Sequence, residues 1–319
     1  MARPKLGLTY LLWAGLVVAM PLVGVRWVDS SLGMVAVLQS MVPLTGSVVA
    51  VLFVISVVTR RWRVTAASGA LLSVCATIAV PAVIGRTVAQ ARDDLVVMSA
   101  NLEFGRADAR SLVFAARNHR VDVLVLLEIT PAAVERLRVA GLDSLLPESV
   151  GRSSQDAGGT IVRSRIALTL ADPGLDLLSP NGFDQPVVLI HRPAGDVVLR
   201  AIHSRPPSPV GAADWRSGLA DLQAWRERQP QEQLLMAGDF NSSWGHPGFR
   251  RVAETMTDAH RAAGQGWVRT WPQGCRLIPA FIQLDHVLTG GFSVVDAGVV
   301  NLPNTDHAAI WARLSAESP

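Results

Sequence analysis

Cysteine is scarce in this 319-residue chain, which contains only Cys75 and Cys275. Cys75 lies inside a long apolar run and Cys275 lies far along the chain, so we expect no disulfide between them. The sequence also lacks the Cys/His clusters of structural zinc sites and the glycine-rich loop that cradles nucleotide phosphates. It has no internal repeat and no low-complexity tract. The region from residue 91 onward is nevertheless long enough to bury a substantial core without a disulfide.

A basic excess is missing from most of the chain. The formal net charge is +3, but residues 1–85 hold six basic residues and one acidic residue, whereas the remainder holds 23 basic and 25 acidic residues. The positive charge therefore belongs to the flanks of the apolar runs and not to a nucleic-acid-binding face. This balance is compatible with a phosphate-bearing substrate but gives no electrostatic argument for DNA.

Three long runs near the N-terminus lack charge altogether: 6–25, 30–59 and 64–85. Each is long enough to cross a hydrocarbon core of about 30 Å as a helix. A signal peptide would explain only the first run, and buried core helices are the alternative explanation for all three. We expect three transmembrane helices, at about 6–25, 33–59 and 64–85, in a membrane anchor that covers 1–90.

Basic residues beside these runs predict the orientation of the anchor. Five of them flank the first run and fill the loop before the third: Arg3, Lys5, Arg60, Arg61 and Arg63. Three lie on the other side: Arg26, Arg86 and Arg92. We therefore expect a multi-pass protein of the plasma membrane, with a cytoplasmic N-terminus and an extracytoplasmic domain over 91–319.

The residues after the anchor alternate between apolar strands and helical segments, which is typical of an α/β fold. We expect strands at 95–101, 121–127, 160–165, 187–190, 197–202, 234–239, 284–288 and 308–312. We expect helices at 107–120, at 130–140, around 215–225 and near 244–252. Residues 141–186 give no clear pattern beyond the strand at 160–165.

Polar residues recur where these strands end. They are Asn101, Glu128, His203, Asp239 with Asn241, Asp285, and Asp306 with His307. Hydrolysis of a phosphoester needs a hard cation, an oriented water and donors for the developing negative charge. Glu128 and Asp306 suit Mg²⁺, which prefers carboxylate oxygens. Asp239 is placed to orient the water, while the asparagines and histidines are suitable donors to phosphate oxygens.

Six short segments resemble the motifs of the endonuclease/exonuclease/phosphatase superfamily, in the family order. They are Ser99-Ala100-Asn101, Leu127-Glu128, Ile202-His203-Ser204, Gly238-Asp239-Phe240-Asn241, Leu284-Asp285-His286-Val287-Leu288 and Thr305-Asp306-His307. This superfamily includes deoxyribonuclease-like enzymes, abasic-site nucleases, bacterial sphingomyelinases and inositol polyphosphate phosphatases. The three-span anchor resembles a membrane-tethered bacterial branch of it. The last motif has Thr305 where serine is usual, which keeps the hydroxyl.

The resemblance implies a four-layer α/β sandwich, in which two mixed β-sheets face each other between helices. It also implies a metal site at Glu128, with Asn101 and Asp306 helping to bind Mg²⁺, or Mn²⁺ as an alternative. Asp239 would align or deprotonate the water, and His307, oriented by Asp285, would donate to a non-bridging oxygen.

Phosphate binding is assigned to Asn101, His203, Asn241 and His307, with His203 also stabilising the transition state or protonating the leaving oxygen. Glu103 is either a further metal ligand or an exposed loop residue. We expect His119 and His260 on helix surfaces, His191 and His246 in turns, and His286 in the packing. Trp244 and Trp271 belong either to the aromatic core or to a substrate rim.

The function expected is metal-dependent hydrolysis of a phosphoester in a nucleic acid, a phospholipid or an inositol phosphate. The alternative is a non-catalytic, membrane-tethered module that binds a phosphorylated ligand. A strongly basic groove would favour nucleic acid, whereas a membrane-proximal site with an apolar rim would favour lipid headgroups. The expected partners are the phosphoester substrate and the lipid bilayer, and no obligate protein partner is evident.

Overall fold

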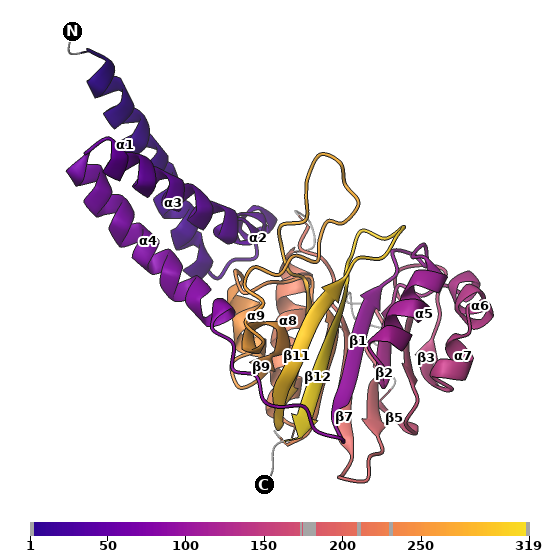
Figure 1. Cartoon of the computed structure of the whole chain (residues 1–319). Coiled ribbons are helices and arrows are strands. Elements are labelled where there is room, and N and C mark those ends of the chain that lie inside the picture. The colour runs from indigo at the N-terminus through magenta and orange to yellow at the C-terminus, as the bar shows by residue number, and fades with distance from the viewer. Residues whose placement is uncertain (1–2, 173, 175–182, 209–211, 230–231, 317–319) are drawn as a thin grey trace.

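The computed structural model describes residues 3–172, 174, 183–208, 212–229 and 232–316, and consists of an N-terminal group of helices joined to an α/β sandwich (Figure 1). The helical group comprises α1 (Arg3–Gly24), the short 3-10 helix η1 (Val25–Trp27), α2 (Gly33–Ser40), α3 (Val42–Val58) and α4 (Trp62–Val83). Two helical stretches, Gly7–Trp27 and Trp62–Val83, are long and apolar enough to cross a membrane. The pair α2 and α3 also passes this test when it is counted as one broken span.

The expected single helix over 33–59 is wrong in one respect, because α2 and α3 meet at an angle of 50°. Pro43 lies at the start of α3. Proline has no backbone N–H, and its ring clashes with the carbonyl oxygen four residues earlier, so a helix arriving from Gly33 cannot run straight through it. The chain instead begins a new helix at Val42, with proline in the first turn where it is tolerated.

The sandwich contains two six-stranded mixed sheets. In the first sheet the strand order is β11-β12-β1-β2-β4-β3, and in the second it is β5-β6-β7-β8-β10-β9. The first-sheet strands are β1 (Leu95–Asn101), β2 (Val123–Leu127), β3 (Glu148–Arg152), β4 (Thr160–Ser164), β11 (Phe292–Val300) and β12 (Ala309–Ala316). The second-sheet strands are β5 (Leu168–Asp172), β6 (Val187–Ile190), β7 (Val197–His203), β8 (Leu234–Asp239), β9 (Thr257–Asp258) and β10 (Asp285–Gly290).

Helices cover the outer face of each sheet. Those on the first sheet are α5 (Ala109–Asn118), α6 (Pro131–Val139) and α7 (Leu142–Leu145), and those on the second are α8 (Ala212–Glu227) and α9 (Pro247–Val252), while α10 (Ala259–Ala262) lies near the join with the anchor. Alternate strand residues serve the two faces: Val97 and Val125 lie in the core between the sheets, whereas Val96 and Leu124 pack under α5 and α6. The expected sandwich of two mixed sheets between helices is therefore confirmed. Strands β3, β5, β9 and β11 were not expected, since none of them has a sustained apolar alternation.

The N-terminal helices pack directly on the sandwich. Ala36 of α2 is 1% exposed and shares a core with Trp215 of α8 and Phe249 of α9. The Gln39 side chain donates hydrogen bonds of 2.9 and 2.7 Å to the carbonyl oxygens of Val25 and Val28. Helix α2 is thus fixed both to η1 and the residue after it and to the sandwich.

A second attachment lies at the end of α4. The backbone N–H of Arg86 donates to the Ala262 carbonyl at 2.7 Å, and that of Gly266 donates to the Ala82 carbonyl at 2.8 Å. The segment 86–94 then reaches β1 without regular structure, as its polar sequence predicts.

Candidate active site

Strand pairing brings the predicted polar residues of both sheets to one edge. In the first sheet β1 and β2 are parallel, and Asn101 pairs with Leu127, directly before Glu128. In the second sheet His203 of β7 pairs with Asp239 of β8, and Asp239 also pairs with Asp285 of β10. Parallel strands carry their carboxyl ends to the same edge, so these side chains meet there.

Asp239 lies at the centre of the group and is 1% exposed. Its Oδ1 accepts a 2.8 Å hydrogen bond from the backbone N–H of Asn241, and its Oδ2 accepts from the Asn101 side-chain amide at 3.2 Å. Gly238 has a φ of +147°, and a Cβ there would lie 1.9 Å from the carbonyl oxygen of Ile202. The glycine is therefore required for β7 and β8 to approach closely enough to place His203 beside Asp239.

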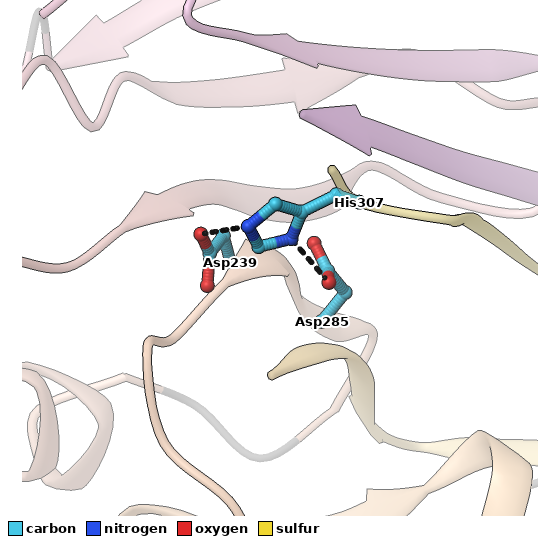
Figure 2. Close-up of side chains that lie close together, drawn as sticks. All are labelled: Asp239, Asp285 and His307. Atoms are coloured by element: carbon cyan, nitrogen blue, oxygen red, sulfur yellow. Dashed lines mark hydrogen bonds and ion pairs between the residues drawn. The ribbon is translucent and has the colours of Figure 1, made fainter. Parts of the chain in front are cut away.

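His307 lies between two carboxylates, as Figure 2 shows. Its Nδ1 is 2.8 Å from Asp285 Oδ2, and its Nε2 is 3.7 Å from Asp239 Oδ2. Thr305 fixes the loop that carries it, because the Thr305 hydroxyl donates to the Asn101 carbonyl at 2.9 Å and accepts from the His307 N–H at 3.2 Å. The hydroxyl at position 305 thus ties the loop before β12 to the end of β1.

Charge decides where the proton resides in this group. Burial alone would lower the pKa of His307, but Asp285 and Asp239 outweigh burial and raise it to about 10. Burial raises the pKa of Asp239 to about 7, even though His307 opposes that change. The imidazole is therefore the cation of the group, and a carboxyl with a pKa near neutrality is suited to accept a proton from water.

Glu128 is held in a fixed orientation beside Asp239. Its Oε1 accepts from Asn101 Nδ2 at 3.1 Å and its Oε2 accepts from the Phe104 backbone N–H at 2.9 Å. Burial raises the pKa of the Glu128 carboxyl. In this orientation Asn101 presents its amide nitrogen to the site, while its oxygen accepts from the Glu103 N–H at 3.0 Å. Asn101 would bind a metal through Oδ1 only after its side-chain amide rotated to exchange the positions of its oxygen and nitrogen.

His203 contributes a neutral imidazole. It is 1% exposed, its Nε2 lies 3.7 Å from Glu128 Oε1, and its ring stacks on Phe183 at 4.2 Å between centroids. Burial, with a smaller contribution from His307, lowers the pKa of His203 to about 3. A neutral imidazole can donate a hydrogen bond, but it is a poor source of a full proton at neutral pH.

Asp306 completes the group, held by Trp271. The Trp271 indole N–H donates to Asp306 Oδ2 at 3.0 Å. The Asn241 side-chain amide donates to the Ser204 carbonyl at 2.7 Å, and the backbone of Asn241 has a φ of +45°.

A cavity of about 880 Å³ is lined by six predicted site residues: Glu128, His203, Asp239, Asn241, Asp306 and His307. Asn101 and Asp285 lie behind them as hydrogen-bonding partners.

The donor set fits a hard divalent cation. Four carboxylates meet here, those of Glu128, Asp239, Asp285 and Asp306, and among the described residues that line the cavity there is no lysine or arginine. One imidazolium does not balance that charge, and oxygen ligands of this kind favour Mg²⁺ or Mn²⁺ over softer metals. Single ligand atoms of Asp239, Asp285 and His307 also lie within 4.8 Å of one another. However, the Asp285–His307 hydrogen bond already occupies Nδ1, so Glu128 and Asp306 are the better ligands.

Of the other residues placed from the sequence, two histidines differ from the expectation, whereas His286 and Glu103 agree with it. His260 is buried rather than on a helix surface, since its Nε2 donates to the Gly298 carbonyl at 3.1 Å. His246 follows a turn but is 1% exposed, and its Nε2 donates to the Ala36 carbonyl at 3.0 Å. His286 packs in the core as expected and pairs with Asp258 at 2.8 Å. Glu103 pairs with Arg106 at 2.7 Å, which agrees with the loop assignment.

The two tryptophans have different environments. Trp244 belongs to the packing, where its indole N–H donates to Asp258 Oδ2 at 2.9 Å. Trp271 lines the cavity, which agrees with the rim assignment. Sequence reasoning missed Phe104 and Phe183, each a lone aromatic without a clear pattern around it, and α2, which was expected inside the membrane.

Comparison with known proteins agrees with this geometry. A model of the Endonuclease/Exonuclease/phosphatase family matches residues 98–307. No curated protein sequence matches the chain. A crystal structure of truncated Caenorhabditis elegans TDP2 is similar, with 17% identity and a TM-score of 0.58 over 70% of this chain and 98% of that one.

Two further crystal structures share the fold. One is D. rerio TDP2 complexed with a single-strand DNA product, with 14% identity and a TM-score of 0.57 over 70% of this chain and 100% of that one. The other is an endonuclease/exonuclease/phosphatase family protein from Bacteroides thetaiotaomicron, with 13% identity and a TM-score of 0.53 over 70% and 98%. Identities this low establish the fold alone, whereas the family model spans most of the sandwich and every site residue from Asn101 to His307. The chain belongs to the endonuclease/exonuclease/phosphatase family.

Proposed function

We propose that this protein is a membrane-anchored, extracytoplasmic, metal-dependent phosphoesterase or phosphodiesterase. The observation that carries the proposal is the Asp239–His307–Asp285 arrangement, in which Asp239 and His307 line one cavity together with Glu128 and Asp306. Proteins of this family hydrolyse phosphoesters, generally with a divalent metal. A module that only binds phosphate would not need a carboxyl group whose pKa is about 7 beside an oriented imidazolium.

Glu128 and Asp306 are the proposed ligands of Mg²⁺ or Mn²⁺, with Asn101 orienting Glu128. A bound divalent ion supplies Lewis-acid polarisation of the phosphoryl group and neutralises its charge. The hydrogen bonds to Glu128 from the Asn101 amide and the Phe104 N–H prevent its carboxylate from rotating away. Trp271 does the same for Asp306.

The remaining site residues act on water and phosphate. Asp239 accepts a proton from the attacking water, held for this by the Asn241 N–H. The Nε2–H of His307 donates to a non-bridging oxygen, and Asp285 fixes its tautomer from the other side. The amides of Asn241 and Asn101 both donate to Asp239 Oδ2, and either would donate to the phosphate by exchanging that hydrogen bond for one to a phosphate oxygen. His203, being neutral, stabilises the developing charge by hydrogen bonding rather than by transferring a proton.

The membrane part of the proposal rests on the helical group. Its surface exposes many large apolar side chains, such as Leu11, Val17, Met20, Val51 and Val58. The turn between α3 and α4, with Arg60 and Arg61, lies at the end of the bundle remote from the sandwich, as does the N-terminus (Figure 1). The positive-inside rule then puts this end in the cytoplasm and the site outside. We place the anchor at 1–90 and the catalytic domain at 91–319.

The test is hydrolysis of bis(p-nitrophenyl) phosphate by the full chain in detergent, with Mg²⁺ and with EDTA. We expect turnover that EDTA abolishes and Mg²⁺ restores. Asp239→Ala and His307→Ala should each lose several orders of magnitude in kcat, because each removes part of a cooperating unit. Turnover that survives EDTA would contradict the metal mechanism, and wild-type rates in either variant would contradict the roles assigned.

A further inference from the structure

The cavity that holds the site has one polar end and one apolar wall. The wall comes partly from the bend between α2 and α3, through Val37, Met41 and Leu44. The opposite side comes from the segment after β9 and α10, through Ile278 and Phe281. Phe104 and Phe183 close the sides near Glu128 and His203. The helices of the anchor thus form part of the same cavity as Asp239 and His307.

The volume and the lining define the shape of the ligand. About 880 Å³ is far more than one phosphate occupies, and cavities of this size take ligands with a substantial apolar part. A polynucleotide would need cations for the phosphates on either side of the scissile one. In the part of the chain that the structure describes, the lining residues provide none.

Two guanidinium groups lie beside aromatic side chains of the lining. Arg106 lies 5.8 Å from the centroid of the Phe104 ring, and Arg205 lies 5.8 Å from that of Phe183. Aromatic rings with adjacent cations are typical of the headgroup level of a bilayer, where one side is apolar and the other carries phosphate.

We propose that the substrate is a membrane phospholipid, which enters between the α2–α3 bend and the 271–282 segment with its phosphate at His307 and its acyl chains along Val37, Met41 and Ile278. This inference rests on the proposed phosphoester hydrolysis and assigns its substrate class. In the reaction the water oxygen bonds to phosphorus, the bond from phosphorus to one ester oxygen breaks, and the water proton reaches that leaving oxygen. The products are an alcohol and a phosphomonoester, and no further reactant is needed.

The exposed residues at the entrance support a bilayer as the source. Leu32, Met34 and Val37 around α2 are 66%, 67% and 47% exposed, and Leu277 and Ile278 on the facing segment are 91% and 53% exposed. Single exposed apolar residues are ordinary, but Val37 and Ile278 line the cavity itself, and each has exposed apolar neighbours in its own segment that lipid would cover. In Figure 1 the loop that precedes β10 and helix α2 lie on the same end of the sandwich, next to the helical bundle.

The experiment uses the full chain in mixed micelles that contain phosphatidylglycerol, phosphatidylcholine or phosphatidylinositol. Soluble bis(p-nitrophenyl) phosphate and a single-stranded DNA oligonucleotide are assayed under the same conditions. We expect kcat/KM for at least one phospholipid to exceed that for the oligonucleotide by tenfold or more. Faster cleavage of the oligonucleotide, or turnover of the soluble diester with no turnover of any of the three phospholipids, would overturn the lipid assignment alone. Absence of turnover on every phosphoester would overturn the proposed function as well.

Two variants test the route of entry. Val37→Asp and Ile278→Asp each put a charge on one wall, and we expect each to lower the ratio of phospholipid to soluble-diester kcat/KM by at least tenfold. Ile278 lies on an exposed segment, so its variant tests the route even if Val37→Asp fails to fold. The control is Val139→Asp, since Val139 is 70% exposed at the end of α6, on the side of the sandwich away from α2 (Figure 1). An unchanged ratio in Ile278→Asp would refute the route.

Discussion

Gly245 offers a direct test of the contact between the anchor and the sandwich. A Cβ built on Gly245 would lie 2.3 Å from the backbone carbonyl oxygen of Gln39 in α2. Ordinary contacts of this kind are 3.4 Å or longer. In Gly245→Ala, α2 must therefore withdraw by roughly 1 Å, and a backbone atom cannot rotate aside as a side-chain end can.

The expected cost follows from what α2 holds in place. Withdrawal loosens the packing of Ala36 against Trp215 and lengthens the hydrogen bond from His246 to the Ala36 carbonyl. Overpacking of this kind costs about 1–3 kcal/mol in unfolding free energy. In thermal unfolding this corresponds to roughly 2–4 °C in Tm for each kcal/mol. Because α2 also forms one wall of the cavity, phospholipid turnover should fall more than turnover of a soluble diester.

The assay is thermal unfolding of the full chain in detergent, followed by the two hydrolysis rates. The matched control is Gly24→Ala, because Gly24 has a φ of −63° and a Cβ there meets nothing within 4 Å. We expect the control to be as stable as the wild type. If Gly245→Ala were equally stable and kept the wild-type rates, α2 would not be docked as described.

Three further changes test the site and its surroundings. Asp285→Asn keeps the shape but removes the charge that orients the His307 imidazole, so kcat for soluble diester should fall about 10²–10⁴-fold with little change in KM, and a fall below threefold would contradict the pairing. Trp271→Phe keeps the ring but loses the donor to Asp306, so the Mg²⁺ concentration for half-maximal rate should rise about 10–100-fold, and an unchanged Mg²⁺ titration would argue against Asp306 as a ligand. Burial lowers the pKa of His246 to about 4, so its neutral form stabilises the fold above the unfolded pKa of about 6.5, and this contribution is lost as pH falls toward 4. Between pH 7 and 5 the wild type should lose roughly 2 kcal/mol of unfolding free energy that His246→Gln keeps, and equal losses in both proteins would refute that role.

The candidate site was the most predictable part of the molecule. Strands such as 234–239 are apolar runs that end in charged or amide side chains. Asp239 and Asn241 both line the cavity, although β8 ends at Asp239 and Asn241 follows it with a φ of +45°. Strands β1 and β8 are buried along their whole length, so the point where each apolar run gives way to a polar residue, and not an alternation, marks the end that reaches the site. The meeting of Glu128, Asp239 and His307 therefore follows from patterns that a single sequence contains.

The contact between the anchor and the sandwich was not predictable in the same way. Nothing local distinguishes Ala36 from the other small residues of its apolar run, and its burial depends on Trp215 and Phe249 far along the chain. The burial of His260 and His246 has the same origin, since each donates to a carbonyl oxygen of a distant segment. The periodicity of a sequence predicts which face of a helix or strand is buried. It does not predict which other helix or strand packs against that face, and these contacts depend on that.

The two attachments of the sandwich, at α2 and at the end of α4, also have a mechanical consequence. A body joined at one point can swivel, whereas one joined at two separated points keeps a fixed height and tilt above its support. The backbone hydrogen bonds from Arg86 to Ala262 and from Gly266 to Ala82 hold α4 and α10 in direct contact. In a bilayer, the phosphorus atom of the substrate would then have to lie at one fixed depth. Substrates would reach the site by lateral diffusion within the leaflet and not from the aqueous phase.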